Sequence, residues 1–334
     1  MTLPILLTGK SGQIGRELQR LLACVGEVTA LERQELDLAK PDDIRRAIRA
    51  FRPRIVVNAA AYTAVDRAES DEARAHAINA EAPGVMAEEA KRIGALLVHY
   101  STDYVFDGSK GAPYVEDDEP NPQNVYGQTK LAGERAVQQS GASHLVFRTA
   151  WVFAREGRNF LLTILRLATQ REELRIVDDQ FGSPTWSREV AVATTTILSQ
   201  LCARTGGPAS LSDVSGIYHL TASGETSWCE FAKAILQEAS RCGPIDPWFG
   251  AATGQRPIIA RRVTPITTRE YPTPARRPAY SVLCNARMKE VFGVQLPDWQ
   301  SQLRGAFMSD TSPQPRSGIN AHAKESPGRT RQHG

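Results

Sequence analysis

A glycine-rich turn near the start of the chain constrains the fold most. The segment LLTGKSGQIG at residues 6–15 includes the end of an apolar run from Leu3 to Thr8, as in a buried parallel strand. A strand, a glycine turn and an amphipathic helix in this order predict a phosphate-binding βα unit. The apolar residues that predict the helix recur at intervals of three or four, apart from one adjacent pair, and are Ile14, Leu18, Leu21, Leu22 and Val25.

The turn contains Gly-Lys-Ser, which also ends the phosphate loop of ATPases. That loop needs a further glycine five residues before Gly9, where this chain has Pro4. The glycines instead match a spacing that holds dinucleotides, with the pyrophosphate at the helix N-terminus. Glycine turns of this spacing also occur without a ligand, so the prediction depends on the motifs that follow. The predicted pyrophosphate-binding residues are Gly9, Ser11, Gly12, Gln13, Ile14 and Gly15.

The residues after the second predicted strand bear on the cofactor's ribose. Glu32 favours a ribose 2′-hydroxyl, as in NADH, whereas Arg33 favours a 2′-phosphate, as in NADPH. Asp37 and Leu38 are expected to line the adenine pocket, although Leu38 fits a core position as well. The sequence alone leaves the choice between the two cofactors open.

Strand-like and helix-like segments alternate through the first half of the chain. This alternation predicts an α/β fold: a Rossmann-type doubly wound parallel sheet with a smaller C-terminal substrate-binding region. After the first βα unit, we expect strands at residues 28–31, 55–58, 95–100 and 145–148. We expect one helix that begins at residue 41, one long helix that ends at about residue 93, and one helix over residues 125–139.

The rhythm changes after residue 150. We assign residues 1–150 to the NAD(P)-binding domain, with later segments such as 187–221 returning to it. Residues 151–308 are assigned mainly to the substrate-binding region, because Pro- and Gly-rich loops there are typical of segments that carry specificity. Residues 309–334 have almost no large apolar side chains, which predicts a disordered tail.

Tyr126 and Lys130 form the strongest catalytic feature. Four residues apart on a helix, they lie on one face. A nearby ammonium stabilises a phenolate, so Lys130 is expected to lower the pKa of Tyr126 from its usual value of about 10. Such a phenol can give a proton to a carbonyl oxygen as hydride reaches the carbon. A tyrosine–lysine pair on the surface would show the same spacing.

Polar residues at the ends of two predicted strands fit the same chemistry. Ligands of open parallel sheets bind at the carboxyl ends of the strands. Thr102 at the end of the fourth strand can hold a substrate carbonyl. Asn58 ends the third strand, and Ala59, Ala60 and Ala61 after it leave room for a flat cofactor.

Together these motifs resemble those of the extended short-chain dehydrogenases/reductases and, within them, of the dTDP-4-dehydrorhamnose reductases. The resemblance runs from about residue 3 to residue 300. The segments that carry it are GKSGQIGREL, NAAAYTAVDRAES, HYSTDYVFDG, NVYGQTKLAGE, FRTAWVF, DDQFGSPT, YPTPARRP and LPDWQ.

The resemblance implies reduction of the 4-keto group of dTDP-4-dehydro-L-rhamnose to dTDP-L-rhamnose. NADPH is the implied hydride donor, with NADH as the alternative. Tyr126 is then the general acid, Lys130 its pKa modifier and a cofactor ligand, and Thr102 the residue that orients the carbonyl.

The resemblance also implies residues that bind the nucleotide sugar. Those near the sugar would be Val65, Asp103, Tyr104 and Trp151. Those at the nucleotide diphosphate would be Asn159, Phe160, Gln180, Pro184, Thr185 and Arg276. Aliphatic and aromatic side chains of these types also fill protein cores, and Arg276 with Arg277 would otherwise be a solvated pair.

Some proteins of this family are expected to dimerise around Mg²⁺ held by glutamates, at positions matched by Glu17 and Glu189. The third position falls at residues 309–310, which are Ser-Asp in this chain. The sequence therefore argues against a bound metal, leaves a need for Mg²⁺ open, and is compatible with either a monomer or a homodimer.

The bulk composition argues against other classes of protein. A net charge of +3 over 334 residues is not that of a nucleic-acid binder. The apolar runs fall short of the ~18 residues of a membrane span, and the N-terminus lacks the basic start of a signal peptide. The five cysteines have no metal-binding or disulfide spacing. We therefore expect a cytoplasmic protein whose partner is a small nucleotide sugar.

Two other classes of function stay open at this stage. A nucleotide-sugar 4,6-dehydratase or 4-epimerase would share the fold, the tyrosine and the lysine. A dehydratase, however, needs an Asp-Glu pair where this chain has Asp103-Tyr104. A non-catalytic NADP-binding regulatory subunit would also keep the fold, but the complete set of Thr102, Tyr126 and Lys130 argues against it.

Overall fold

The structure is a computed structural model that describes residues 3–205, 214–241 and 247–308. Its centre is a six-stranded sheet in the order β10-β5-β4-β3-β1-β2, in which every pair of neighbours is parallel. This sheet confirms the predicted Rossmann-type doubly wound fold. Its strands are β1 (Pro4–Thr8), β2 (Glu27–Leu31), β3 (Ile55–Asn58), β4 (Leu96–Thr102), β5 (His144–Thr149) and β10 (Gly216–His219).

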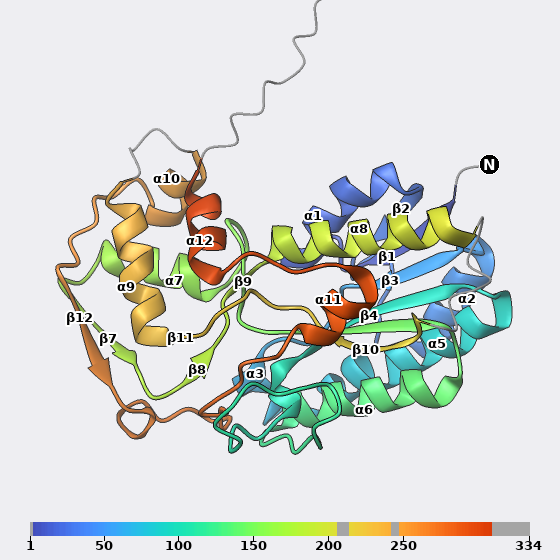
Figure 1. Ribbon diagram of the computed structural model, residues 1–334, viewed down its shortest axis with the longest axis horizontal. Helices are drawn as coiled ribbons and strands as arrows, with labels where there is room; N and C mark the ends of the chain where they lie inside the picture. The colour runs from blue at the N-terminus through green and yellow to red at the C-terminus, as the bar shows by residue number, and fades with distance from the viewer. Residues whose placement is uncertain (1–2, 206–213, 242–246, 309–334) are drawn as a thin grey trace, which may run out of the picture.

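Helices cover both faces of the sheet (Figure 1). Alternate residues of β1 point to opposite faces: Ile5 and Leu7 join the core under α1 and α8, and Leu6 joins the core under α2 and α5. Strands buried on both faces explain the continuous apolar runs in the sequence. The covering helices are α1 (Gln13–Leu21), η1 (Leu22–Cys24) and α8 (Ser187–Thr205) on one face, and α2 (Pro41–Phe51), α5 (Ala82–Ile93) and α6 (Val125–Ser140) on the other.

The stretch before residue 93, predicted as one long helix, is broken. It contains α3 (Val65–Ala68), α4 (Glu72–His76), a π-helical turn η2 (Ala77–Glu81) and then α5. The π-helical turn carries the buried Asn79, whose side chain accepts from the Tyr62 backbone N–H at 2.8 Å and donates to Thr129 Oγ1 at 3.1 Å. These long-range contacts, which helix propensity cannot anticipate, tie the turn to α6 and to the loop after β3.

A second, smaller region lies beside the sheet and holds much of the chain after residue 150 (Figure 1). Its helices pack around the buried Leu165, Phe231 and Leu303. They are α7 (Phe160–Ala168), α9 (Trp228–Ala239), α10 (Pro247–Thr253) and α12 (Trp299–Phe307). Short strand pairs complete it: β6 (Val152–Phe153) with β9 (Thr185–Trp186), β7 (Glu173–Val177) with β12 (Arg262–Ile266), and β8 (Phe181–Gly182) with β11 (Thr226–Ser227).

Three segments of the second half pack on the sheet instead. α8 covers one face, β10 extends the sheet beside β5, and α11 (Ala286–Phe292) places Met288 and Phe292 in the core under that face. Two further short helices are η3 (Asp103–Val105) and η5 (Thr268–Glu270). In the described ranges, each helix is too short or too polar to cross a membrane. The predicted tail at residues 309–334 lies outside the described residues.

Candidate active site

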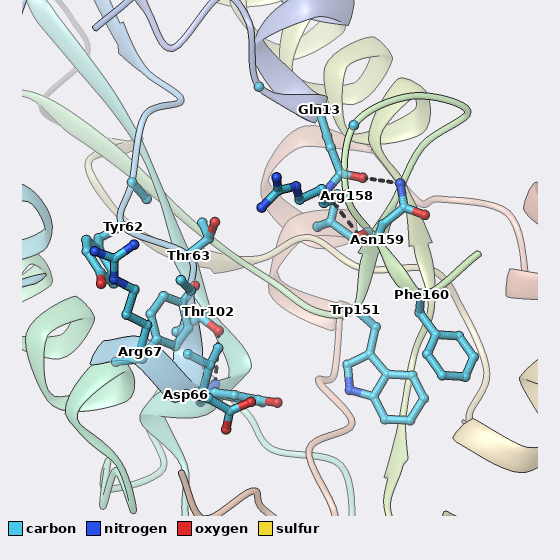
Figure 2. Close-up of a pocket in the computed structure, with 18 of the residues that line it drawn as sticks. Gln13, Tyr62, Thr63, Asp66, Arg67, Thr102, Trp151, Arg158, Asn159 and Phe160 are labelled. Atoms are coloured by element: carbon cyan, nitrogen blue, oxygen red, sulfur yellow. Dashed lines mark hydrogen bonds between the residues drawn. The ribbon is translucent and has the colours of Figure 1, made fainter. Parts of the chain in front are cut away.

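A cleft of about 1330 Å³ lies at the carboxyl ends of the central strands. Residues at the ends of β1, β2, β4 and β5 line it from the sheet side: Thr8, Leu31, Thr102 and Thr149. Residues of α7 and α9 line it from the smaller region. In Figure 2, Trp151, Asn159 and Phe160 lie on one side of the cleft, and Thr102 and Asp66 on the other.

The glycine turn forms one end of this cleft because its geometry requires glycine. Gly9 has φ +78°, and a Cβ there would lie 2.8 Å from the Ala60 nitrogen. A Cβ on Gly15 would lie 2.0 Å from the Gly9 oxygen, so Gly15 packs behind the turn and does not line the cleft. Gly12 precedes α1, and among the described residues no side chain caps this helix. The first N–H groups of α1 are therefore available to an anion in the cleft.

Each of the other predicted pyrophosphate and adenosine residues lines the cleft. From the turn these are Gly9, Ser11, Gly12, Gln13 and Ile14, and from the segment after β2 they are Glu32, Arg33, Asp37 and Leu38. Leu38 belongs to a core cluster as well as to the cleft lining. The Lys10 ammonium pairs with Glu35 at 2.6 Å, which gives the lysine of the Gly-Lys-Ser segment a partner within the chain.

The end of β3 lies directly beneath the turn. Ala59, Ala60 and Ala61 line the cleft, whereas Asn58 is buried below them. The Asn58 Oδ1 atom accepts from Thr8 Oγ1 at 2.8 Å and from the Ala60 N–H at 3.3 Å. Asn58 therefore shapes the floor of the site and does not itself line it.

The three predicted catalytic residues, Thr102, Tyr126 and Lys130, line the same cleft. Local packing brings them together. Asn124 caps α6 by accepting from the Gly127 N–H at 2.8 Å. A Cβ on Gly127 would lie 2.2 Å from the Tyr104 carbonyl oxygen, so only glycine allows α6 to pack this close to the end of β4. The rings of Tyr126 and Tyr104 meet edge to face, with centroids 5.7 Å apart.

The electrostatics of Tyr126 differ from the sequence prediction. Burial raises the pKa of Tyr126 to about 12. Burial also lowers the pKa of Lys130 to about 8. Lys130 Nζ donates to the Tyr100 carbonyl at 2.5 Å and lies 3.1 Å from His99 Nε2. These contacts hold Nζ, so in this geometry burial dominates and the phenol is less acidic than usual.

Asp103 contacts the threonine of the site. It is buried, and its Oδ1 atom accepts from Thr102 Oγ1 at 3.0 Å. Burial raises the pKa of this carboxyl to about 6. Thr102 Oγ1 in turn accepts from the Tyr104 N–H at 3.2 Å. The threonine hydroxyl is thus held in place by two neighbours along the chain.

Aromatic rings form the wall opposite the sheet. Trp151 has φ +46°, a left-handed conformation that a non-glycine residue adopts at a cost. Its indole stacks on Trp228, with centroids 3.4 Å apart and planes 3° from parallel. A Cβ on Gly182 would lie 2.4 Å from the indole, so that glycine leaves room for the ring. Trp228 lines the cleft but was missed in the sequence, where nothing local distinguishes it from a core aromatic residue.

The remaining residues expected to bind the nucleotide sugar fall into two groups. Those that line the cleft are Val65, Asp103, Tyr104, Trp151, Asn159, Phe160 and Gln180. Pro184 and Thr185 do not line it. The buried Thr185 Oγ1 donates to the Ser183 carbonyl at 2.9 Å and accepts from the Ala222 N–H at 3.0 Å, which makes it a link within the smaller region.

Asn159 joins the two sides of the cleft. Its Oδ1 accepts from the Leu162 N–H at 3.0 Å and so caps α7. Its Nδ2 donates at 2.9 Å to Oε1 of Gln13, the residue at which α1 begins (Figure 2). Gln180 is anchored differently, since its amide donates to Thr268 Oγ1 at 3.0 Å.

The neighbouring arginines Arg276 and Arg277 are placed differently. Arg276 is exposed and does not line the cleft; its carbonyl accepts from Asn124 Nδ2 at 2.7 Å. Arg277 lines the cleft and donates to both oxygens of Asp66, at 2.8 and 3.1 Å. Other charged lining residues that the sequence did not single out are Asp66, Arg67, Asp71, Arg74, Arg158, Arg171 and Arg175.

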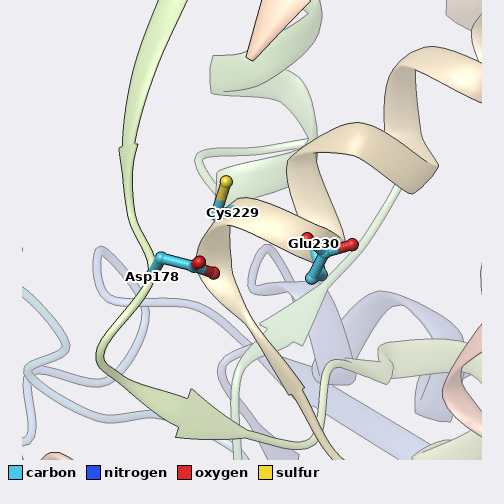
Figure 3. A group of neighbouring side chains, drawn as sticks. All are labelled: Asp178, Cys229 and Glu230. Atoms are coloured by element: carbon cyan, nitrogen blue, oxygen red, sulfur yellow. The ribbon is translucent and has the colours of Figure 1, made fainter. Parts of the chain in front are cut away.

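The carboxylates considered for a metal lie away from the cleft lining. Glu17 is on α1 and Glu189 on α8, two helices that cover the same face. The third position at residues 309–310 lies outside the described residues. Within the described ranges, one group of three possible ligands occurs, made of Asp178, Cys229 and Glu230 (Figure 3).

That group is accounted for by helix capping. The Ser227 hydroxyl accepts from the Glu230 N–H at 3.1 Å at the start of α9 and donates to Asp178. Burial raises the pKa of the Cys229 thiol, which disfavours the thiolate that a metal needs.

The chain is similar in sequence and in structure to known proteins. A family model described as the RmlD substrate binding domain matches residues 1–311. A dTDP-4-dehydrorhamnose reductase from Burkholderia thailandensis is 51% identical over 296 residues, which cover 89% of this chain and 95% of that protein. The corresponding protein of Escherichia coli K12 is 43% identical over 300 residues, with coverages of 89% and 94%.

A solved structure is similar as well. It is the crystal structure of dTDP-4-dehydrorhamnose reductase from Bacillus anthracis in complex with NADP. The two structures have a TM-score of 0.80 and 32% sequence identity, and the match covers 92% of this chain and 99% of that one.

Proposed function

Because the chain belongs to the dTDP-4-dehydrorhamnose reductase family of oxidoreductases, we propose that it catalyses the last step of dTDP-L-rhamnose synthesis. In this step the 4-keto group of dTDP-4-dehydro-L-rhamnose is reduced with NADPH. One observation carries the proposal: Thr102, Tyr126 and Lys130 line the same cleft as the glycine turn. A binding protein without catalysis would not need this set in one place.

The residues of the cleft fit the cofactor. The positions of Gly9 and Gly15, where a Cβ would collide with backbone, leave the turn and the N-terminus of α1 open to a pyrophosphate. Glu32 and Arg33 line the cleft after β2, where the adenosine would lie, and Ala59 to Ala61 line its floor. When bound, NADPH supplies the hydride.

Tyr126 gives the proton in this scheme. A phenol with a raised pKa stays protonated at neutral pH, so it can donate a hydrogen bond to the keto oxygen and then its proton as negative charge develops there. Thr102 would hold the same oxygen. Because its single hydroxyl proton is directed at Asp103 in this structure, it must turn from Asp103 to the substrate. Lys130, one helical turn from Tyr126, would stabilise the phenolate that remains.

The nucleotide sugar would lie between the sheet and the aromatic wall. Trp151 offers the apolar ring face that sugar C–H groups pack against, and Val65 and Tyr104 close the other side. For the diphosphate we propose Arg277 in place of Arg276, because a guanidinium inside the cleft can pair with phosphate oxygens. Asn159, Phe160 and Gln180 remain proposed neighbours of the nucleotide.

The direct test is a spectrophotometric assay of NADPH consumption with enzymatically prepared dTDP-4-dehydro-L-rhamnose. We expect substrate-dependent oxidation of NADPH and formation of dTDP-L-rhamnose. Repeating the assay with NADH measures cofactor preference, and repeating it with EDTA measures any need for Mg²⁺. Absence of turnover with either cofactor, in protein that binds NADPH, would favour a non-catalytic role.

A further inference from the structure

A buried chain of hydrogen bonds leads from Asn58 through His99 to Lys130. Asn58, His99 and Lys130 are each 1% exposed. His99 Nδ1 lies 3.1 Å from Asn58 Nδ2, and His99 Nε2 lies 3.1 Å from Lys130 Nζ. The imidazole on β4 therefore bridges β3 and α6 directly beneath the catalytic residues.

The direction of these hydrogen bonds follows from the fixed end of the chain. The Ala60 N–H can only donate, so the Asn58 atom that faces it is the amide oxygen, which also accepts from Thr8 Oγ1. The Asn58 NH₂ group then faces His99 Nδ1, which must accept. Burial holds the pKa of His99 well below its usual value, so the ring is neutral and carries one proton. That proton lies on Nε2 and points at Lys130 Nζ.

We propose that His99 is a positioning residue that donates its Nε2–H to the lone pair of Lys130 Nζ and thereby favours the neutral amine over the ammonium. Nζ in turn donates to the Tyr100 carbonyl, so the nitrogen is held between two fixed partners on β4. The inference rests on the proposed function for the role of Lys130 in catalysis, but the contacts themselves do not depend on it.

Other titratable groups act on Lys130 and on Tyr126. Glu134 follows Lys130 by one turn of α6 and favours the ammonium. Arg148 of β5 holds this carboxylate with two hydrogen bonds of 3.0 and 2.7 Å, which balances its charge. On the cleft side, Asp103 faces Tyr126 and raises the pKa of the phenol. Glu134, Arg148 and Asp103 act through their charges, whereas the His99 side chain is in hydrogen-bond contact with Lys130 Nζ.

The contact has a consequence for turnover. A lysine near its usual pKa of about 10.4 holds its proton firmly, whereas one that titrates nearer neutrality can exchange it. After Tyr126 has given its proton to the sugar oxygen, the ammonium form of Lys130 can pass a proton to the phenolate oxygen and become the neutral amine. The amine left behind accepts the His99 Nε2–H, and solvent in the cleft returns a proton to Nζ.

Two substitutions separate this contact from core packing. An asparagine amide replaces the imidazole near Nδ1, and a glutamine amide replaces it near Nε2. His99→Asn therefore keeps a partner for Asn58 and loses the one for Lys130, whereas His99→Gln does the reverse. The full chain is labelled with ¹³C at lysine Cε, and the Lys130 resonance is identified by its loss in Lys130→Met.

We expect the titration midpoint of Lys130 to rise by about one pH unit or more toward that of free lysine in His99→Asn, and to stay near the wild-type value in His99→Gln. Similar melting temperatures of the two variants would show that both substitutions disturb the packing of the core to the same extent. With substrate, the kcat of His99→Asn should be about tenfold lower than that of the wild type, because a pKa change of one unit corresponds to a factor of about ten. The KM for NADPH should change little.

Two outcomes would overturn the proposal. A lower midpoint in His99→Asn would mean that an ammonium donates to the imidazole, the reverse of the assigned direction. Equal midpoints in both variants and the wild type would mean that His99 does not act on Lys130. Because the titration needs neither substrate nor cofactor, either result is separate from a failure of the proposed reduction.

Discussion

At the scale of single residues, Tyr126 is the group whose chemistry the proposed function depends on most. Replacing Tyr126 by phenylalanine removes the hydroxyl and keeps the ring that contacts Tyr104. We expect Tyr126→Phe to lower kcat by about 10²–10⁴, the usual loss for a general acid, and to leave the dissociation constant for NADPH nearly unchanged. Steady-state kinetics and a fluorescence titration with NADPH measure the two quantities.

The matched control is Tyr218→Phe. Tyr218 is a buried tyrosine on β10 whose hydroxyl donates to the Val214 carbonyl at 2.8 Å, away from the cleft. This variant should lose some stability but keep its kcat. If Tyr126→Phe turned over at a rate close to the control, the phenol would have no part in the chemistry.

Lys130 should reveal its burial in the pH dependence of stability. Burial lowers its pKa to about 8, whereas a lysine in the unfolded chain stays charged to about pH 10.4. The folded state therefore binds fewer protons between these values, and wild-type stability gains as the pH rises through this window. The cost at neutral pH, up to roughly 3 kcal/mol, disappears above it.

Lys130→Met removes the titrating group. We expect the free energy of unfolding of the wild type, relative to this variant, to increase by about 1–3 kcal/mol between pH 7 and pH 10. Urea unfolding at several pH values, with ionic strength held constant, gives the difference. A difference that does not change with pH would mean that Lys130 has an ordinary pKa.

At the scale of the elements, Gly127 determines how closely α6 approaches β4. A Cβ there would lie 2.2 Å from the Tyr104 carbonyl oxygen and 3.0 Å from the Pro122 side chain. Gly127→Ala adds one methyl group and favours the helix, yet we expect it to destabilise the fold by about 1–3 kcal/mol through overpacking. It should also lower kcat, because Tyr126 would move relative to Thr102.

Gly84→Ala provides the comparison. Gly84 lies on α5, and its Cβ would lie 3.1 Å from the Ala136 methyl group, a contact that a small shift can relieve. Thermal unfolding and kcat are measured for both variants. A Gly127→Ala protein as stable and active as Gly84→Ala would show that the close approach is not required.

The elements that could be predicted from sequence are those with local causes. The glycine turn, the strand before it and the stripe of α1 lie within about twenty-five residues, and the predicted start of α2 and both predicted ends of β3 agree with the structure. The π-helical turn could not be predicted, because the partners of Asn79 are Tyr62 and Thr129, which approach it only in the folded chain. Alanine-rich composition favours an unbroken helix and conceals this requirement.

At the scale of the whole molecule, the cleft-lining residues that the sequence analysis did not assign to a site come from segments that only the tertiary fold brings together. Asp66, Trp228 and Arg277 all line the cleft, although more than 160 residues separate the first from the second. Their types are common in cores and on surfaces, so no spacing in the sequence distinguishes them. Thr102, Tyr126 and Lys130 could be predicted because strand ends and helix faces place side chains by rule.

The two neighbouring arginines give the last prediction. Although they are adjacent in the sequence, Arg277 lines the cleft while Arg276 is exposed. Loss of a charge-assisted hydrogen bond costs about 1.5–3 kcal/mol, so Arg277→Ala should raise the KM for the nucleotide sugar by roughly ten- to a hundredfold. The KM for NADPH should change little, because the glycine turn lies at the other end of the site.

Two further variants separate substrate binding from the ion pair between Asp66 and Arg277. Asp66→Asn keeps the guanidinium but removes its partner charge, so it should affect the KM for the nucleotide sugar less than Arg277→Ala does. Arg276→Ala leaves the cleft lining intact and should behave almost as the wild type does. Steady-state kinetics on all three variants decide between the arginines. A larger rise in this KM for Arg276→Ala would place the diphosphate outside the cleft lining described above and would restore the assignment that the sequence alone suggested.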